Sequence, residues 1–399
     1  MTSASVARCI NEVLPGEVFG VIFEKHADLE WKAPLIDGRV CRQWRQTILC
    51  SPRAWAHLLI VHKFISAPSK LNEWLDRSGS APLHIQAVNW TQGVETVLNQ
   101  HRKRIRSISL YDHSIAFLEN RAFPILQSLT VNRLNTSTPM IRWSACAAMP
   151  ALFSFRASYI SMGALPSTVF PPLRVLALST VDDCDSIIRN SYHSLTSLVL
   201  GGISLQDTSQ PLEFPSLRFL SLYGVNNLKH RMNAPALTTY HESDEMEGES
   251  FSESLPSLIE YGIYQLKSPF NVTKLHQCYP SISRLSLRAH PSIAKLFLHS
   301  LSGQPTALPM LRILAVDTVY NSMEYSEEDK GSMMKDVSGR NMASSVKMEL
   351  YFDGMVQLPL YFGAVRVHIN KGQSKLTFTL SRIFPIEDLS FIFGLWLPC

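Results

Sequence analysis

The chain has 399 residues, too many for one ordinary hydrophobic core, so two or three domains or one elongated repeat array are expected. Hydrophobic residues make up 46% and charged residues 18%, which excludes a disordered protein. The 37 basic and 33 acidic side chains are too evenly balanced to indicate nucleic-acid binding by electrostatics alone. Seven cysteines, odd in number and without a CxxC pair, argue against a zinc ribbon or a disulfide framework and favour a reducing compartment.

No segment has the pattern of a targeting signal or a membrane span. Residues 1–17 lack an apolar run as long as that of a signal peptide. The apolar stretch 389–397 is about half of the roughly 20 residues needed to cross a bilayer. We therefore expect a soluble protein of the cytoplasm, the nucleus or both.

The first expected domain, residues 12–60, carries the pattern of three short helices. Apolar residues recur with helical spacing over 18–23, and a second helix is expected near 30–35. A third is expected over 40–48, and a strand follows at 58–60. Three short helices make a core too thin to be stable alone, so their apolar faces need a partner.

A helical connector with a first repeat is expected over 61–100, followed by an array of repeats over 101–340. The array repeats a Pro-x-Leu-x-x-Leu-x-Leu pattern, which is clearest from Pro215 to Leu222. The first apolar residues of the copies are Ile105, Leu126, Leu152, Leu173, Leu195, Leu217, Leu237, Leu258, Ile282 and Leu311. Their intervals of 20 to 29 residues match the spacing of leucine-rich repeats.

Each copy alternates apolar and other residues, so its last leucines share one face of a strand. One such unit cannot bury that face alone, and neighbouring copies must stack to build a continuous core. The expected fold class is therefore α+β, with a short three-helix segment followed by an irregular α/β solenoid that has a curved parallel sheet.

Two polar, acidic segments, 241–253 and 323–339, are expected to be mobile surface loops between repeats. Residues 341–399 are expected to form a C-terminal cap of strands. The alternating stretches that predict these strands are 346–352, 364–369 and 376–380.

The sequence carries none of the common catalytic or nucleotide-binding motifs, so we expect no enzymatic activity, no cofactor and no metal site. The basic cluster 100–106 could serve nuclear import or phosphate binding. The simpler interpretation is a solvated helix end that enters a repeat strand, with Ile105 and Ile108 turned inward. We expect neither a nucleic-acid nor a membrane partner.

The N-terminal motifs resemble an F-box. They read Leu14-Pro15-x-Glu17-Val18-x-x-x-Ile22-Phe23, Ala33-Pro34-Leu35, Val40-Cys41-Arg42-x-Trp44-Arg45 and Ser51-Pro52-Arg53-x-Trp55-x-x-Leu58. They are most similar to the F-box proteins that are numerous in mushroom-forming fungi. The segment from Leu71 to Leu83 resembles the connector that leads into leucine-rich repeats in that family. The resemblance covers residues 12 to about 90 well and the repeats loosely.

The resemblance implies a substrate-recognition subunit of an SCF-type ubiquitin ligase. Such a subunit docks on a Skp-type adaptor, and through it on a cullin, and is monomeric within its complex. Its repeats hold a target protein, here unknown, for ubiquitination by other subunits. By motif match, the adaptor-facing residues would be Leu14, Pro15, Val18, Ile22, Leu35, Val40, Cys41, Trp44 and Trp55. About half of these could instead fill the domain's own core, and a protein-interaction scaffold without ubiquitination is the alternative function.

In repeats of this type, residues that alternate with the leucines point to the concave face of the sheet. Aromatic residues and arginines are favoured at the centres of interfaces. The candidates for target binding on this face are Tyr111, Arg156, Phe219, Tyr223, Tyr264, Arg284 and Arg288. The alternative interpretation is that these residues are ordinary solvent-exposed side chains with no role in binding.

Overall fold

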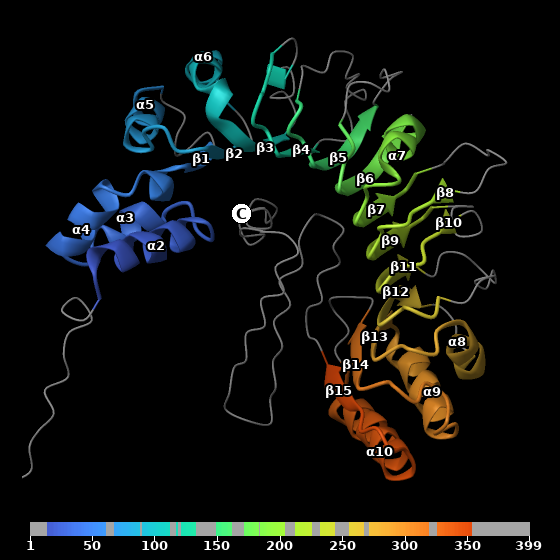
Figure 1. Ribbon diagram of the computed structural model, residues 1–399. Helices are drawn as coiled ribbons and strands as arrows, with labels where there is room; N and C mark the ends of the chain where they lie inside the picture. The colour runs from blue at the N-terminus through green and yellow to red at the C-terminus, as the bar shows by residue number, and fades with distance from the viewer. Residues whose placement is uncertain are drawn as a thin grey trace, which may run out of the picture. The chain divides into compact units, whose positions relative to one another are not determined.

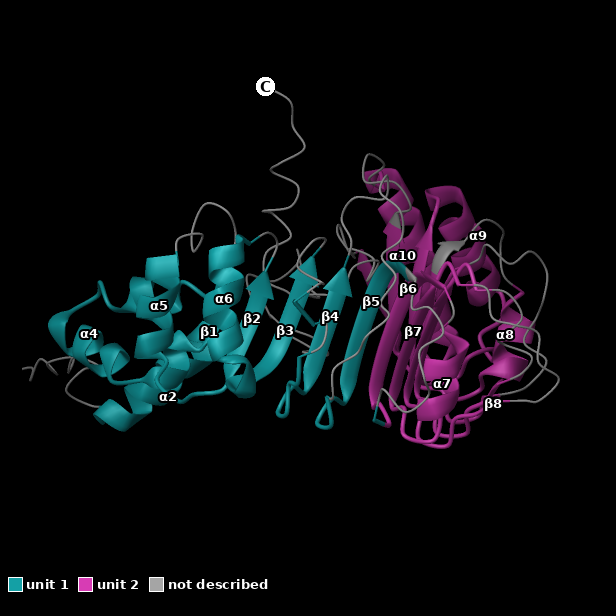
Figure 2. Cartoon of the chain, turned by 90° about the horizontal axis from the view of Figure 1, so that it is seen from above, with its two compact units in different colours: residues 1–171 teal, residues 172–399 magenta. Residues whose placement is uncertain are grey.

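The structure of the protein is a computed structural model (Figure 1). It describes residues 14–60, 68–87, 90–111, 117–118, 121–132, 149–161, 171–182, 184–203, 212–225, 232–243, 255–266, 271–318 and 325–352. The chain forms two compact units, residues 1–171 and 172–399, coloured teal and magenta in Figure 2. The boundary between them falls inside the expected repeat array.

The first unit combines a group of small helices with parallel strands. Its elements are α2 (Gly16–Ala27), α3 (Ala33–Asp37), α4 (Arg42–Leu49), η1 (Pro52–Trp55), β1 (His57–Ile60), α5 (Pro68–Arg77), β2 (Leu83–Ala87), α6 (Gln92–Gln100), η2 (Arg102–Arg104), β3 (Ile105–Tyr111), β4 (Ser128–Asn132) and β5 (Ser154–Ser161). The strands pair in the order β1-β2-β3-β4-β5, each parallel to the next. The three predicted N-terminal helices are present as α2, α3 and α4.

The second unit repeats the same strand geometry. Its elements are β6 (Val175–Asp182), α7 (Asp185–Ser191), β7 (Ser197–Gly201), β8 (Leu212–Glu213), β9 (Phe219–Tyr223), β10 (Met232–Asn233), β11 (Thr239–Ser243), β12 (Glu260–Leu266), α8 (Val272–Cys278), β13 (Arg284–Ala289), α9 (Pro291–Ser302), β14 (Ile313–Thr318), α10 (Glu327–Ala343) and β15 (Glu349–Phe352). The order β6-β7-β9-β11-β12-β13-β14-β15 is parallel throughout. β8 and β10 pair separately.

All ten predicted repeat strands are present. β3 begins at Ile105, and each of the other nine strands begins two residues after its predicted first apolar residue. Those ten residues are buried, with at most 2% of their surface exposed. The register stacks equivalent side chains, as in the row Leu176, Leu198 and Leu220 of β6, β7 and β9. The chain is thus a mixed α/β protein with parallel strands, compatible with an α/β solenoid.

The prediction of a surface loop over 323–339 is wrong from Glu327 onward, because these residues belong to α10. Ser326 and Asp329 cap this helix reciprocally, which satisfies donors at its N-terminus. Its buried residues Met333, Val337 and Arg340 follow helical spacing, and the helix packs against α9. The acidic charge of the segment had hidden this sparse apolar pattern.

The other expectations for acidic and C-terminal segments have mixed outcomes. Residues 241–243 belong to β11 and are buried, so the loop predicted over 241–253 does not begin where expected. A strand within 346–352 is confirmed as β15. The remainder of that loop and the predicted elements at 364–369, 376–380 and 389–397 lie outside the described residues. Of the helices that are described, none is both long and apolar enough to cross a membrane.

Candidate functional site

The N-terminal helices have a small aromatic core. Phe19 and Phe23 of α2 are each 1% exposed, and the ring of Trp44 of α4 lies 5.5 and 5.1 Å from theirs. α4 begins at Cys41, whose Sγ accepts a hydrogen bond from the backbone N–H of Trp44 at 3.4 Å. These aromatic contacts bury one face of α2. The side chains on the other side of the helix remain exposed to solvent.

The available faces of these helices are apolar. Val18, Val21 and Ile22 share one side of α2 by their i, i+3, i+4 spacing and are 40%, 57% and 44% exposed. Leu35 and Val40, from the α3 region, are 40% and 59% exposed. Eight of the fifteen large hydrophobic residues that are exposed in the described part of the chain lie before residue 50. Apolar side chains gathered in this way mark an interaction surface.

The structure divides the nine adaptor candidates into three groups. Pro15, Val18, Ile22, Leu35 and Val40 are exposed, Leu14, Cys41 and Trp44 are half-buried, and Trp55 is buried. The Nε1–H of Trp55 donates to the backbone oxygen of Ile48 at 2.8 Å, and its ring meets that of Trp74 edge-on at 5.0 Å. Trp55 therefore belongs to the core of the first unit and not to an exposed face.

A polar network joins α2 to the first strands. Asp28, just after α2, pairs with Lys25 and with Nε2 of His57 on β1, both at 2.9 Å. The His57 ring stacks on that of His84 on β2, with centroids 4.7 Å apart and planes 5° apart. Burial lowers the pKa of both histidines, that of His84 to about 4, and the charge of Asp28 partly offsets this effect at His57.

The seven target candidates are divided between the two units. Tyr111 and Arg156 belong to the first unit and the other five to the second. Within the second unit, Phe219 and Tyr223 are half-buried on β9, Tyr264 lies in β12, and Arg284 and Arg288 are half-buried on β13. The candidates on β13 face acidic partners, because Arg284 lies 3.6 Å from Glu260 and Arg288 lies 3.7 Å from Asp317.

Arg156 is the least accessible of the six candidates whose side-chain burial the structure describes. Only 9% of its surface is exposed, and burial lowers the pKa of its guanidinium to about 10. It is aligned with Thr130 of β4, which is also buried. A target could reach Arg156 only after rearrangement of its surroundings.

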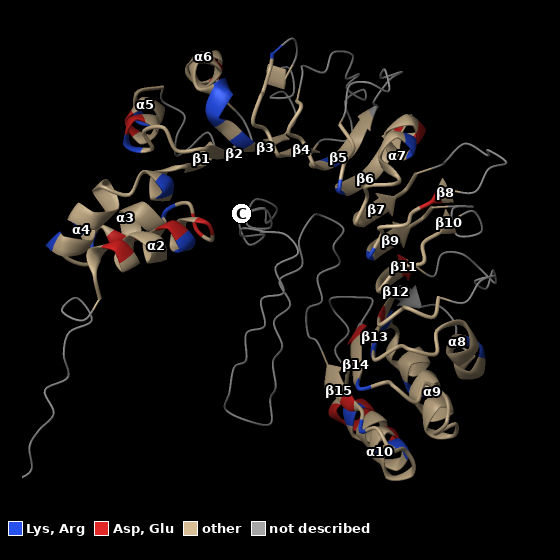
Figure 3. Ribbon diagram, in the orientation of Figure 1, with Lys and Arg blue, Asp and Glu red and all other residues tan. Residues whose placement is uncertain are grey.

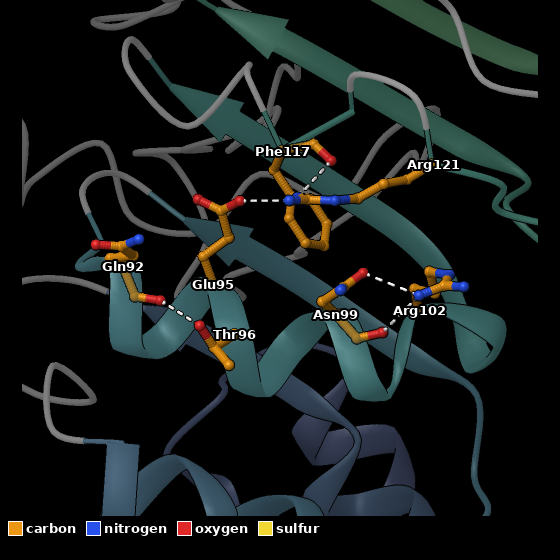
Figure 4. Close-up of polar contacts among 7 residues, drawn as sticks. All are labelled: Gln92, Glu95, Thr96, Asn99, Arg102, Phe117 and Arg121. Atoms are coloured by element: carbon orange, nitrogen blue, oxygen red, sulfur yellow. Dashed lines mark hydrogen bonds and ion pairs between the residues drawn. The ribbon is translucent and has the colours of Figure 1, made fainter.

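The basic cluster 100–106 is the end of α6 and the start of β3, where Ile105 and Ile108 are fully buried, as the simpler interpretation predicts. Arg102 donates to the side chain of Asn99 at 3.1 Å (Figure 4). Arg104 donates to the hydroxyl oxygen of Ser78 at 2.7 Å. Two of the cluster's arginines therefore have structural partners. The same view shows Glu95 of α6 paired with Arg121 at 2.7 Å.

The second unit contains a buried carboxylate that is not among the predicted site residues. Glu242 of β11 is 6% exposed and accepts hydrogen bonds from the hydroxyls of Tyr240, at 2.9 Å, and of Tyr261. Burial, and then the charge of Glu242, raises the pKa of both tyrosines. The Tyr279 ring lies 4.9 Å from that of Tyr261. The repeat register could have revealed this cluster, because Tyr240 and Glu242 follow Leu237 at positions that hold leucine in other copies.

The described residues include no group of three or more histidine, cysteine, aspartate or glutamate side chains placed to hold a metal ion. Two surfaces stand out among the described residues: the exposed apolar face of α2 to α4 and the polar edge and face of the strands. No protein-family model matches the chain, and no curated protein matches it in sequence.

Proposed function

We propose that the protein is the substrate-recognition subunit of an SCF-type ubiquitin ligase. The helices α2 to α4 dock on a Skp-type adaptor, and through it on a cullin, while the parallel-strand repeats hold a target protein. The observation that supports this proposal most is the apolar face of these helices. Four of its exposed residues, Val18, Ile22, Leu35 and Val40, coincide with positions that the F-box resemblance assigns to the adaptor.

A docking role accounts for the composition of this face. The three short helices have only a small aromatic core, and the side chains of Val21 and Ile22 add little to their stability while they remain in water. Burying apolar surface against a partner contributes about 25 cal/mol for each Å² removed from water. A helical docking module of this kind, joined to the strands through Asp28 and His57, would hold a target at a defined place relative to the adaptor.

The test is co-purification of the full chain with a Skp-type adaptor and a cullin, using surface variants that spare the core. The double variant Val21→Asp, Ile22→Asp places charge on two exposed positions of α2 and leaves the buried Phe19 and Phe23 unchanged. We expect this variant to lose adaptor binding at unchanged thermal stability. The matched control is Ile259→Asp, which alters an apolar residue that is 50% exposed in the second unit and should still bind.

Two results would contradict the proposal. A folded parent chain that binds no adaptor would remove the ligase function and leave a repeat scaffold that binds proteins without ubiquitination. Equal binding by the parent and the α2 variant would show that the apolar face is not the docking surface. The scaffold alternative also predicts that target levels in cells do not depend on the ubiquitin system.

A further inference from the structure

The amino-terminal edge of the second unit's sheet carries an ordered row of polar residues. Arg174, Thr196, Arg218 and Thr238 each stand immediately before a strand (β6, β7, β9 and β11), and we name them the arginine rim. Backbone hydrogen bonds fix their order: the N–H of Thr196 donates to the oxygen of Arg174, that of Arg218 to Thr196 and that of Thr238 to Arg218, at 2.8 to 3.0 Å.

This register sets the distance between the backbones of Arg174 and Arg218. Adjacent strands lie about 4.8 Å apart, so Arg174 and Arg218, two strands apart, have backbones separated by about 10 Å. The hydroxyls of Thr196 and Thr238 donate to the backbone oxygens of Arg174 and Arg218, each at 3.1 Å. The threonines thus bind the backbone beneath each arginine, while both arginine residues are exposed.

Among the described residues, the rim and the row of first strand residues that follows it on the same four strands hold no acidic side chain. The first residues of the same four strands are Val175, Ser197, Phe219 and Thr239, so these two rows contain two arginines and no carboxylate. Among the residues that the structure describes, neither guanidinium makes an ion pair or a hydrogen bond. The nearest acidic residue along the row of first strand residues is Glu260 on β12, which lies 3.5 Å from His241 and 3.6 Å from Arg284. Figure 3 colours the lysine and arginine residues blue and the aspartate and glutamate residues red.

We propose that the arginine rim binds an acidic peptide segment of a partner protein, in which two carboxylates lie about 10 Å apart. Guanidinium groups bind carboxylates through two parallel hydrogen bonds, and the fork geometry makes arginine more selective for this than lysine. The half-buried ring of Phe219 beside Arg218 offers apolar contact to the same segment. The proposal rests on the proposed function only in that the segment would belong to the target held by the repeats.

The test measures peptide binding to the purified full chain by fluorescence anisotropy at low and moderate ionic strength. The probe is a fluorescein-labelled peptide of glutamate and serine, and its control is the same peptide with every glutamate replaced by glutamine. We expect the glutamate peptide to bind at least about tenfold more tightly than the glutamine peptide, with the difference shrinking as salt screens the charges. Arg174→Ala with Arg218→Ala should weaken binding of the glutamate peptide to the level of the glutamine peptide.

A matched variant separates a local site from the overall positive charge of the chain. Lys274→Ala with Lys335→Ala removes two exposed cations from α8 and α10 and should leave the affinity within about twofold. Equal affinities for the two peptides, or equal losses in the two double variants, would overturn the proposal. The adaptor plays no part in this assay, so its failure is distinguishable from that of the docking function: a chain that binds the adaptor but not the peptide refutes the rim alone.

Discussion

The stacked pair His57–His84 makes the stability of the first unit depend on pH. The ring of His84 is held in its neutral form chiefly by burial, and the positive charges of a protonated His57 and of Arg106 oppose its protonation further. Its pKa is about 4 in the folded chain against 6.5 for an ordinary histidine. Because the unfolded chain takes up the proton more readily, stability is complete above pH 6.5 and is lost as the pH falls toward 4.

The size of the effect follows from these two values. Each pH unit between the two pKa values costs about 1.4 kcal/mol, so lowering the pH from about 7.5 to about 5 should destabilise the first unit by about 2 kcal/mol through His84 alone. That is a large fraction of the roughly 5–15 kcal/mol by which domains are usually stable. Burial also lowers the pKa of His57, which adds to the loss in the same direction, while the nearby Asp28 opposes it.

Urea denaturation followed by tryptophan fluorescence measures this loss, because six of the seven tryptophans lie before residue 172. The variant His84→Phe retains a flat ring against His57 but cannot be protonated, so the fall in stability between neutral pH and pH 5 should shrink by about 2 kcal/mol. His299→Asn, at a side chain that is 83% exposed, should leave the fall unchanged. If the parent and His84→Phe lose equal stability on acidification, the reasoning is refuted.

Two buried polar groups give further predictions. Glu242→Ala takes away the acceptor of the Tyr240 and Tyr261 hydroxyls and leaves a cavity, so urea denaturation monitored by circular dichroism should show a loss of about 2–4 kcal/mol. A change within about 0.5 kcal/mol would contradict this. Arg340→Ala deprives the backbone oxygens of Ala307 and Leu308 of a donor and should cost about 3 kcal/mol. Hydrogen exchange should then accelerate in α10 but not in α2, and uniform acceleration would argue against a local role.

The strands of this protein were predictable because their periodicity is short and repeated. Leu217, Leu220 and Leu222 alternate in the same way as the leucines of the other copies, and the structure places a strand at, or two residues after, every predicted first apolar residue. The N-terminal helices were predictable for a similar reason, since Phe19 and Phe23 recur at helical spacing. Short-range sequence patterns predict both the strands and the helices, without information on contacts between residues far apart in the chain.

Side chains whose role depends on distant partners were not predictable to the same degree. Trp55 was assigned to the docking face, yet Trp74 and the backbone of Ile48 hold it in the core. A docking face and a core require the same large apolar residues, so only the packing separates them. Arg340 likewise looks like an ordinary helix cation in the sequence, but its partners lie 32 and 33 residues earlier in the chain.

The carboxylate of Glu242 affects which register the repeat strands adopt when they pair during folding. In a stack of leucine rows, a strand that slips by two residues exchanges one leucine for another, so the core itself distinguishes poorly between correct and shifted pairings. The same slip in β11 would separate Glu242 from the Tyr261 hydroxyl on β12, while Tyr240 on the same strand moves with it, so the buried carboxylate would lose one of its two donors at a cost of about 1–3 kcal/mol. The contact between Glu242 and Tyr261 therefore favours one register between β11 and β12, and the strands that pair on either side follow from it.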